Sequence, residues 1–260
     1  MDKLKPKMIV MDLDGTLLTD NGCVSAYTLS ILEKCKEKNI KIGIATARSE
    51  YSCKRYIEQI KPNFSIVNGG AVTFIENSIF RKEFISKEIA YKIITELYGK
   101  NDVGEIHFDT EDEKYTVCDQ DMDPNILYKE KYKYWNINKK IEHDLQKIRL
   151  ELFNKDIYLD LKEKFTECDI VEFRGEDWHM IKDKNATKII GLKNIIRNMQ
   201  ITIEDVVAFG DDYNDIEMII ECGIGIAMKN GINEIKSKAN FVCGKNNNNG
   251  VGNWIVENIL

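Results

Sequence analysis

Acidic residues gather at two places far apart in the sequence, and each group follows a short apolar run. In the first group, Asp12, Asp14 and Thr16 follow the apolar run 8–11, with Gly15 among them to permit a sharp turn. Carboxylates, a hydroxyl and the backbone N–H groups of a turn can hold Mg²⁺ and a phosphate together. Taken alone, these residues could equally form an ordinary polar turn, because short motifs match by chance.

The second acidic group is Gly-Asp-Asp-Tyr-Asn-Asp at residues 210–215, after the apolar run 206–209. Short apolar runs that end in polar residues are typical of buried strands in a parallel sheet, and the carboxyl ends of such strands face one crevice. Asp12, Asp14 and Asp211 could therefore share a cation, without which clustered acids would repel one another. The two groups together favour a magnesium site over two unrelated loops.

Two further residues could contact a phosphate. Thr46 follows the predicted strand 40–45 and offers a hydroxyl, although a threonine there can also simply cap a helix. Lys188 begins a predicted helix and could neutralise a phosphate, with Lys182 and Lys184 as competing candidates.

The elements that must position these residues alternate between strand and helix at both ends of the chain. This alternation is typical of a parallel α/β sheet. The middle of the chain has short strands and helices in a mixed α+β order, over a length sufficient for a domain of its own. We therefore expect an α/β protein whose Rossmann-like core, residues 1–76 and 186–260, is interrupted by an α+β domain at residues 77–185.

Composition excludes several classes of protein. The chain of 260 residues has 37 Lys and Arg against 43 Asp and Glu, so no basic excess exists to drive nucleic-acid binding. No signal peptide and no long uncharged apolar segment are visible, which argues against a membrane protein. Seven scattered cysteines without a Cys-x-x-Cys pair suggest free thiols in a reducing compartment, so we expect a cytoplasmic protein.

One acidic loop imitates a calcium site. Asp119, Asp121 and Asp123 have the spacing of an EF-hand loop, with Glu130 further on. The sixth position is Pro124, where the EF-hand needs a glycine for its sharp turn. We therefore interpret this stretch as an acidic surface loop.

Four motifs in order resemble the haloacid dehalogenase (HAD) superfamily, and specifically its Cof-type phosphatases with a large α/β (type IIB) cap. The motifs are Asp-Leu-Asp-Gly-Thr at 12–16, Thr46 after a strand, Lys188 at the start of a helix, and Gly-Asp-Asp-Tyr-Asn-Asp at 210–215. Two departures are Ala47, where the family has glycine, and Ile189, where it has a small residue. The resemblance covers nearly the whole chain.

The resemblance implies a Mg²⁺-dependent phosphomonoesterase that acts on small phosphorylated metabolites, such as sugar phosphates or phosphorylated cofactors, through an aspartyl phosphate. It implies Asp12 as the nucleophile and Asp14 as the general acid and base. Asp12, the Asp14 backbone carbonyl and Asp211 would hold the metal, with Asp215 as a direct ligand or as support. The implied phosphate-binding groups are Leu13, Thr46, Ala47, Lys188 and Asn214.

The resemblance also implies that Arg48 contacts the substrate or the inserted domain, which would close over the site as a cap. We expect a monomer or a weak homo-oligomer with neither nucleic-acid nor membrane partners. Two alternatives stay open: a phosphomannomutase-like phosphotransferase, and a non-catalytic protein that binds a phosphometabolite.

Overall fold

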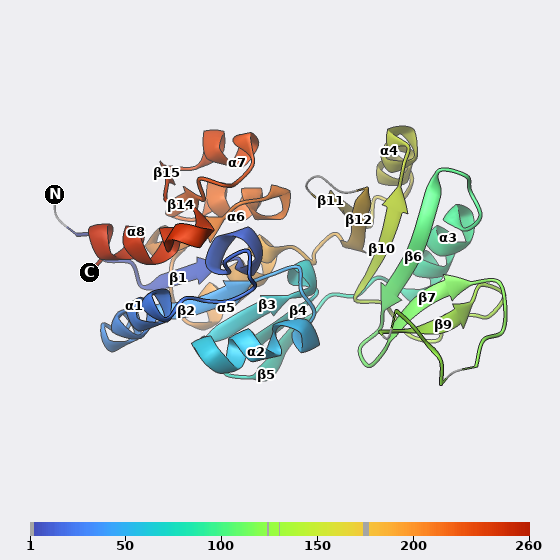
Figure 1. Cartoon of the computed structure of the whole chain (residues 1–260), viewed down its shortest axis with the longest axis horizontal. Helices are drawn as coiled ribbons and strands as arrows, with labels where there is room; N and C mark the ends of the chain where they lie inside the picture. Colours follow the sequence, from blue (N-terminus) through green and yellow to red (C-terminus); the bar gives the residue numbers. More distant parts are fainter. Residues whose placement is uncertain (1–2, 124, 130, 174–176) are drawn as a thin grey trace. The chain divides into compact units, whose positions relative to one another are not determined.

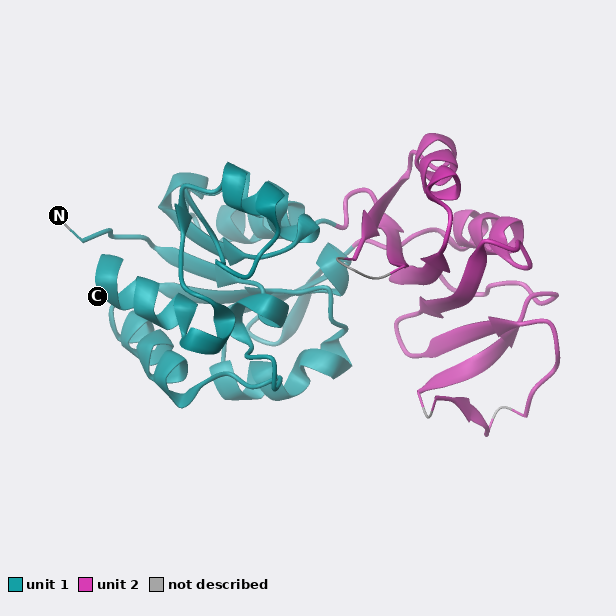
Figure 2. Cartoon of the chain, turned by 45° about the horizontal axis from the view of Figure 1, so that its top comes forward, with its two compact units in different colours: residues 1–82, 187–260 teal, residues 83–186 magenta. Residues whose placement is uncertain are grey.

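The computed structural model describes residues 3–123, 125–129, 131–173 and 177–260, so Pro124 and Glu130 of the acidic loop lie outside the described residues. The chain forms two compact units (Figure 2). Unit 1 comprises residues 1–82 and 187–260, and unit 2 comprises residues 83–186. The α/β fold class with an inserted α+β region is confirmed.

Unit 1 is built on an eight-stranded sheet in the order β15-β14-β13-β1-β2-β3-β4-β5 (Figure 1). The strands are β1 (Met8–Met11), β2 (Lys41–Ala45), β3 (Phe64–Val67), β4 (Val72–Ile75), β5 (Ser78–Lys82), β13 (Val206–Gly210), β14 (Ile224–Ala227) and β15 (Phe241–Val242). Pairing is parallel from β15 to β3, whereas β4 and β5 form antiparallel pairs at one edge.

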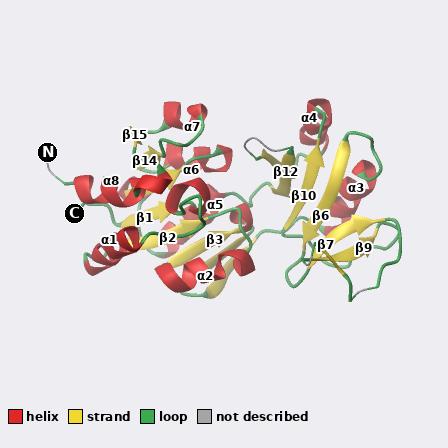
Figure 3. Cartoon of the chain, viewed as in Figure 1, coloured by secondary structure: helices red, strands yellow, loops and turns green. Residues whose placement is uncertain are grey.

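Helices alternate with the strands of unit 1 (Figure 3). They are α1 (Ala26–Glu37), α2 (Glu50–Ile60), α5 (Lys188–Asn198), α6 (Ile216–Glu221), α7 (Asn233–Lys238) and α8 (Gly250–Asn258). Alternate residues of β1 point to opposite faces of the sheet, and Met8 and Val10 pack in one apolar cluster with residues of α5 and α6. From the neighbouring strand, Phe209 packs edge-to-face against Trp254 of α8, at 5.5 Å between ring centroids. Helices therefore cover both faces of β1 and β13. Because both faces are buried, the two strands are continuous apolar runs in the sequence.

The observed boundary of the insertion differs from the predicted one. We expected the inserted domain to begin at residue 77, but Ser78–Lys82 form β5, which pairs with β4 in the sheet of unit 1. The chain therefore leaves unit 1 after Lys82 and returns at Thr187. Short, partly exposed edge strands carry little apolar periodicity. The sequence pattern therefore assigned β5 to the inserted domain.

Unit 2 contains a seven-stranded sheet in the order β11-β12-β10-β6-β7-β9-β8. Its strands are β6 (Val103–Asp109), β7 (Lys114–Cys118), β8 (Leu127–Tyr128), β9 (Tyr132–Asn136), β10 (Lys147–Leu152), β11 (Cys168–Glu172) and β12 (Trp178–Asp183), and its helices are α3 (Lys87–Leu97) and α4 (Lys155–Lys164). Ile106, Phe108 and Ile148 point to one face of this sheet, where they pack in one apolar cluster with residues of both helices. The other face is polar.

The described helices of both units lack the combined length and apolar character that a membrane span requires.

Candidate active site

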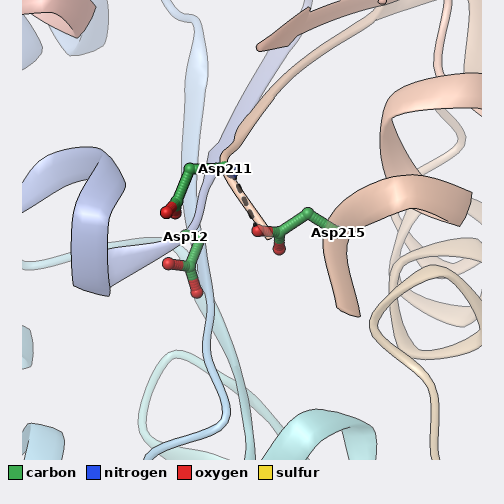
Figure 4. A group of neighbouring side chains, drawn as sticks. All are labelled: Asp12, Asp211 and Asp215. Atoms are coloured by element: carbon green, nitrogen blue, oxygen red, sulfur yellow. Dashed lines mark hydrogen bonds between the residues drawn. The ribbon is translucent and has the colours of Figure 1, made fainter. Parts of the chain in front are cut away.

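Three carboxylates from the two acidic motifs converge at the carboxyl ends of β1 and β13. The two strands are parallel neighbours, with Met11 opposite Phe209, so the residues that follow them emerge side by side. Asp12, Asp211 and Asp215 each offer an oxygen within 4.8 Å of the others, and all three are buried (Figure 4). The fold therefore brings Asp12 and Asp211 together, as the sequence predicts.

The turn after Asp12 brings a hydroxyl to this cluster. Gly15 adopts φ +72°, and a Cβ there would lie 2.3 Å from Asp211 Oδ2, so only glycine fits without displacement. The turn directs the Thr16 hydroxyl to donate to Asp211 Oδ1 at 2.8 Å. The Asp-x-Asp-Gly-Thr spacing therefore links the two motifs physically.

Asp215 fixes the backbone conformation of the second acidic motif, residues 210–215. Its Oδ2 accepts the backbone N–H groups of Asp211 at 3.0 Å and Asp212 at 3.2 Å. Its Oδ1 accepts from Lys188 Nζ at 2.6 Å. Because both oxygens already accept hydrogen bonds, this arrangement favours a supporting position for Asp215 over direct metal ligation.

Lys188 is the cation of the site. The Thr187 hydroxyl caps the start of α5 by accepting the Ile190 N–H at 3.2 Å, and this cap places Lys188 in the first turn. The Lys188 ammonium donates to Asp12 Oδ1 at 2.7 Å and to Asn214 Oδ1 at 3.3 Å, and the residue is 1% exposed.

The competing lysines lie elsewhere. Lys182 pairs with Asp169 at 3.2 Å inside unit 2, and Lys184 is exposed.

The electrostatics of the cluster favour a divalent cation. Burial, reinforced by the charges of Asp215 and Asp211, raises the pKa of Asp12 well above its usual value despite Lys188. Burial, followed by the charge of Asp215, raises the pKa of Asp211 to about 7. Burial lowers the pKa of Lys188, but Asp12 and Asp215 outweigh it, so the net shift is upward. One ammonium among three carboxylates leaves excess negative charge, and an oxygen-only donor set of this kind fits Mg²⁺.

Asp14 lies apart from the buried carboxylates, with a side chain that is 55% exposed. Arg48 binds it bidentately, with Nε 2.7 Å from Oδ2 and a terminal nitrogen 2.6 Å from Oδ1. Thr46 is buried at the carboxyl end of β2, and its hydroxyl accepts the backbone N–H of Arg48 at 3.1 Å. Arg48, expected to contact substrate or the inserted domain, is thus a partner of the predicted acid and base in this structure.

The family of the chain follows from its match to a family model. Residues 9–255 match the model of the haloacid dehalogenase-like hydrolases, from the start of the first strand to the last helix. The chain belongs to the haloacid dehalogenase-like hydrolases. The resemblance inferred from four motifs is confirmed.

Relatives of this HAD-like hydrolase align over nearly the whole chain. The 5-amino-6-(5-phospho-D-ribitylamino)uracil phosphatase YitU of Bacillus subtilis is 26% identical over 273 residues, which cover 97% of each protein. A solved haloacid dehalogenase-like hydrolase from B. subtilis has a TM-score of 0.83 at 24% identity, and covers 98% of this chain and 100% of its own. The HAD subclass IIB sugar phosphatase BT4131 has a TM-score of 0.83 at 22% identity, with coverage of 96% and 98%. The structural matches confirm the fold of this hydrolase.

One residue of the HAD-like site was not singled out by the motifs. Asn230 donates from Nδ2 to the Gly15 carbonyl at 2.6 Å. Asn230 thereby fixes the turn that carries the first motif. The available signal was its position just after β14, because polar residues at the carboxyl ends of parallel strands reach the same crevice.

Mg²⁺ should stabilise this hydrolase, and more so at high pH. The folded pKa of Asp211 exceeds its ordinary 3.8, so the metal-free protein loses stability as pH rises from about 4 to 7. A bound cation offsets the repulsion among the ionised carboxylates of the cluster. At a hundredfold excess over its Kd, binding contributes about 2.7 kcal/mol, which raises the Tm by about 5–10 °C. Thermal unfolding at pH 8 and pH 5.5, with and without MgCl₂, measures the effect. A Tm increase that is equal or larger at pH 5.5 would contradict it.

Proposed function

We propose that the chain is a Mg²⁺-dependent phosphomonoesterase that hydrolyses small phosphorylated metabolites through an aspartyl phosphate on Asp12. The observation that carries the proposal is the buried Asp12 carboxylate, held 2.7 Å from the Lys188 ammonium beside Asp211 and Asp215. Membership of a hydrolase family and relatives named as phosphatases support the reaction class.

In the first step, an Asp12 oxygen attacks the phosphorus in line with the ester oxygen. A bond forms between the Asp12 carboxylate and phosphorus, and the bond to the leaving alcohol breaks. Lys188 and the Thr46 hydroxyl donate to the phosphoryl oxygens, and the Asn214 amide and the N–H groups of Leu13 and Ala47 assist. The 3.3 Å contact between Lys188 Nζ and Asn214 Oδ1 supports a shared role for this pair.

Asp14 supplies the proton to the leaving oxygen and then takes a proton from the water that hydrolyses the aspartyl phosphate. In the structure both Asp14 oxygens are engaged by Arg48. Asp14 must therefore separate from Arg48 before it can transfer a proton. Until then, Arg48 holds the Asp14 carboxylate in a position where it does not act as the acid and base. The contact of Arg48 with the substrate or the inserted domain, which the resemblance implies, stays a prediction.

Asp12, the Asp14 backbone carbonyl and Asp211 would hold Mg²⁺, and Asp215 would support them through the N–H groups that it binds. The bound ion supplies positive charge that offsets the repulsion between the Asp12 carboxylate and a phosphate. The excess of carboxylates over ammonium groups in the cluster supports this assignment.

The substrates are small metabolites with a phosphate ester. YitU is named for a phosphorylated ribityl compound, and BT4131 is titled a sugar phosphatase. All seven cysteines have free thiols, which supports our expectation of a cytoplasmic protein.

Phosphate release from a panel of sugar, polyol and cofactor phosphates, measured with Mg²⁺ and again with EDTA, tests the proposal. We expect release that depends on Mg²⁺ and an order of preference among the substrates. The absence of release from every compound would overturn phosphatase activity. Conversion of one sugar phosphate into an isomer without free phosphate would instead identify a phosphotransferase.

Asp14→Asn should slow turnover about a hundredfold, because general acid–base catalysis contributes this much or more. With p-nitrophenyl phosphate the good leaving group needs little protonation, so Asp12 is still phosphorylated. Hydrolysis of the intermediate then becomes limiting. We expect a burst of nitrophenol equal to the enzyme concentration, followed by slow release of phosphate, in rapid-mixing experiments. A slow reaction without a burst would argue against the second role of Asp14. Asp20→Asn, at an exposed loop residue, serves as the control.

A further inference from the structure

A groove in unit 1 lies between α2 and the paired strands β3 and β4 (Figure 1). Its volume is about 700 Å³. Sites for small molecules typically have volumes of about 300–1,000 Å³, so the groove has a suitable size. All the residues that line it belong to unit 1, and none of them belongs to the proposed catalytic machinery. The groove is therefore a candidate for a second ligand site.

The floor of the groove combines apolar surface with two polar groups. Ser65 of β3 pairs with Phe74 of β4, and the two residues are 4% and 6% exposed, while Ile57 of α2 adds apolar surface. Within the part of the chain that the structure describes, the Ser65 hydroxyl makes no hydrogen bond. The Asn63 Oδ1 accepts the Ile42 N–H at 2.9 Å, and its Nδ2 donor has no partner among those residues. The floor can therefore bind apolar groups together with one amide.

Charges of alternating sign follow the groove along α2. Glu50, Lys54 and Glu58 succeed one another at intervals of four residues, which is about 6 Å along the helix axis. Lys61 at the end of α2 continues the alternation, and Glu76 in the turn after β4 adds a third carboxylate. None of these side chains forms an ion pair within the described residues. A ligand with a positive and a negative group about 6 Å apart can therefore pair with two of them at once.

These groups determine the chemistry of a fitting ligand. Two extended amino-acid residues span at most about 7 Å, so the ammonium and carboxylate ends of a dipeptide have the separation that the charges on α2 require. The peptide group can accept from Asn63 Nδ2 and donate to the Ser65 hydroxyl, while apolar side chains cover Phe74 and Ile57. A single amino acid has no peptide group, and a segment inside a protein has neither charged end.

We propose that the groove between α2 and the β3–β4 pair binds a free dipeptide with apolar side chains. The carboxylate of the dipeptide pairs with Lys54, and its ammonium group pairs with Glu50 or Glu58, one helical turn away on either side. This binding does not depend on the proposed phosphatase function, because the groove shares no residue with the candidate active site.

Titration of the native chain with the dipeptide Leu-Leu, followed by the NMR shifts of the backbone amides, tests the inference. We expect saturating shifts at Ile57, Ser65 and Phe74. Leu-Leu amide, which lacks the carboxylate, should bind about two- to fivefold more weakly, because one partly exposed ion pair is lost.

Reversal of one charge on α2 should reverse this preference. In Lys54→Glu the carboxylate of Leu-Leu is repelled, whereas the purely cationic Leu-Leu amide gains a partner, so the variant should bind the amide more tightly. Lys54 is exposed, so the substitution leaves the core of unit 1 intact. Lys34→Glu, at an exposed position of α1 outside the groove, is the matched control and should keep the native preference.

Several results would overturn the inference. The absence of saturating shifts would do so, as would shifts confined to the residues around Asp12 and Asp211, which would place the dipeptide in the catalytic crevice. Equal affinity of the native chain for Leu-Leu and its amide, or an unchanged preference in Lys54→Glu, would exclude the pairing with Lys54. Because binding is measured without turnover, a chain that releases no phosphate from any substrate would leave this test decisive.

Discussion

Asp12→Asn should abolish phosphate release, with a loss in kcat on the order of 10⁴ or more, as for the removal of other enzyme nucleophiles. The carboxamide has nearly the shape of the carboxylate. Its oxygen can still accept a hydrogen bond from Lys188 Nζ, which in the native chain lies 2.7 Å from Asp12 Oδ1. It cannot form the acyl phosphate. Release of phosphate from the preferred substrate at saturating Mg²⁺ measures the loss, with Asp112→Asn at an exposed turn of unit 2 as the control.

The same variant should be at least as stable as the native chain without metal. Burial and the neighbouring carboxylates raise the pKa of Asp12, which means that its ionised form destabilises the folded state. Asp12→Asn removes the negative charge and with it this destabilisation. Asp12→Asn should therefore keep or raise the Tm in EDTA while Mg²⁺ raises it less than in the native chain. A folded variant that retains a tenth of the native activity would exclude Asp12 as the nucleophile.

Lys188→Met should lower kcat/KM on the order of 10²- to 10³-fold and also destabilise unit 1. The ammonium is the one cation that contacts both Asp12 and Asp215 among the described residues, at 2.7 and 2.6 Å. Its loss removes a donor to the phosphoryl group, which explains the lower activity. It also leaves two buried carboxylates without a counter-charge, at a cost of about 3–5 kcal/mol.

The pH dependence separates the two effects of Lys188→Met. In the native chain Lys188 stays charged throughout the range in which the protein is handled, because Asp12 and Asp215 raise its pKa above the ordinary 10.5. In the variant the carboxylates lose charge only by protonation, so its stability should recover as pH falls from 8 to 5. Urea unfolding at both pH values checks this, with Lys193→Met on the exposed side of α5 as the control. Equal destabilisation at both pH values would point to lost packing instead.

The site was predictable to the extent that sequence motifs coincide with strand ends. β1 and β13 are continuous apolar runs that end at Asp12 and Asp211, and parallel pairing alone brings those ends together. Lys188 could be predicted from its place at a helix start, because the Thr187 cap fixes the first turn of α5.

Contacts made by side chains could not be predicted in the same way. The pair of Arg48 with Asp14 depends on rotamers at two loop ends, which have no periodic pattern. The polar face of unit 2 also escaped prediction, because the alternation in β6 is visible only once its register with β10 is known. The segment from 128 to 140, rich in Lys and aromatic residues, contains β9, whose partner β7 is parallel to it.

The place of β13 in the sheet has a consequence for the synthesis of the protein. Met8 of β1 pairs with Val206, so the strand that carries Asp12 lacks one of its two neighbours until the ribosome has passed the whole of unit 2. Unit 2 is continuous in sequence and can fold as soon as it emerges, whereas the N-terminal half-sheet must wait with an exposed edge. The acidic cluster can therefore form only after β13 and Asp215 have left the ribosome, by which time unit 2 has already emerged.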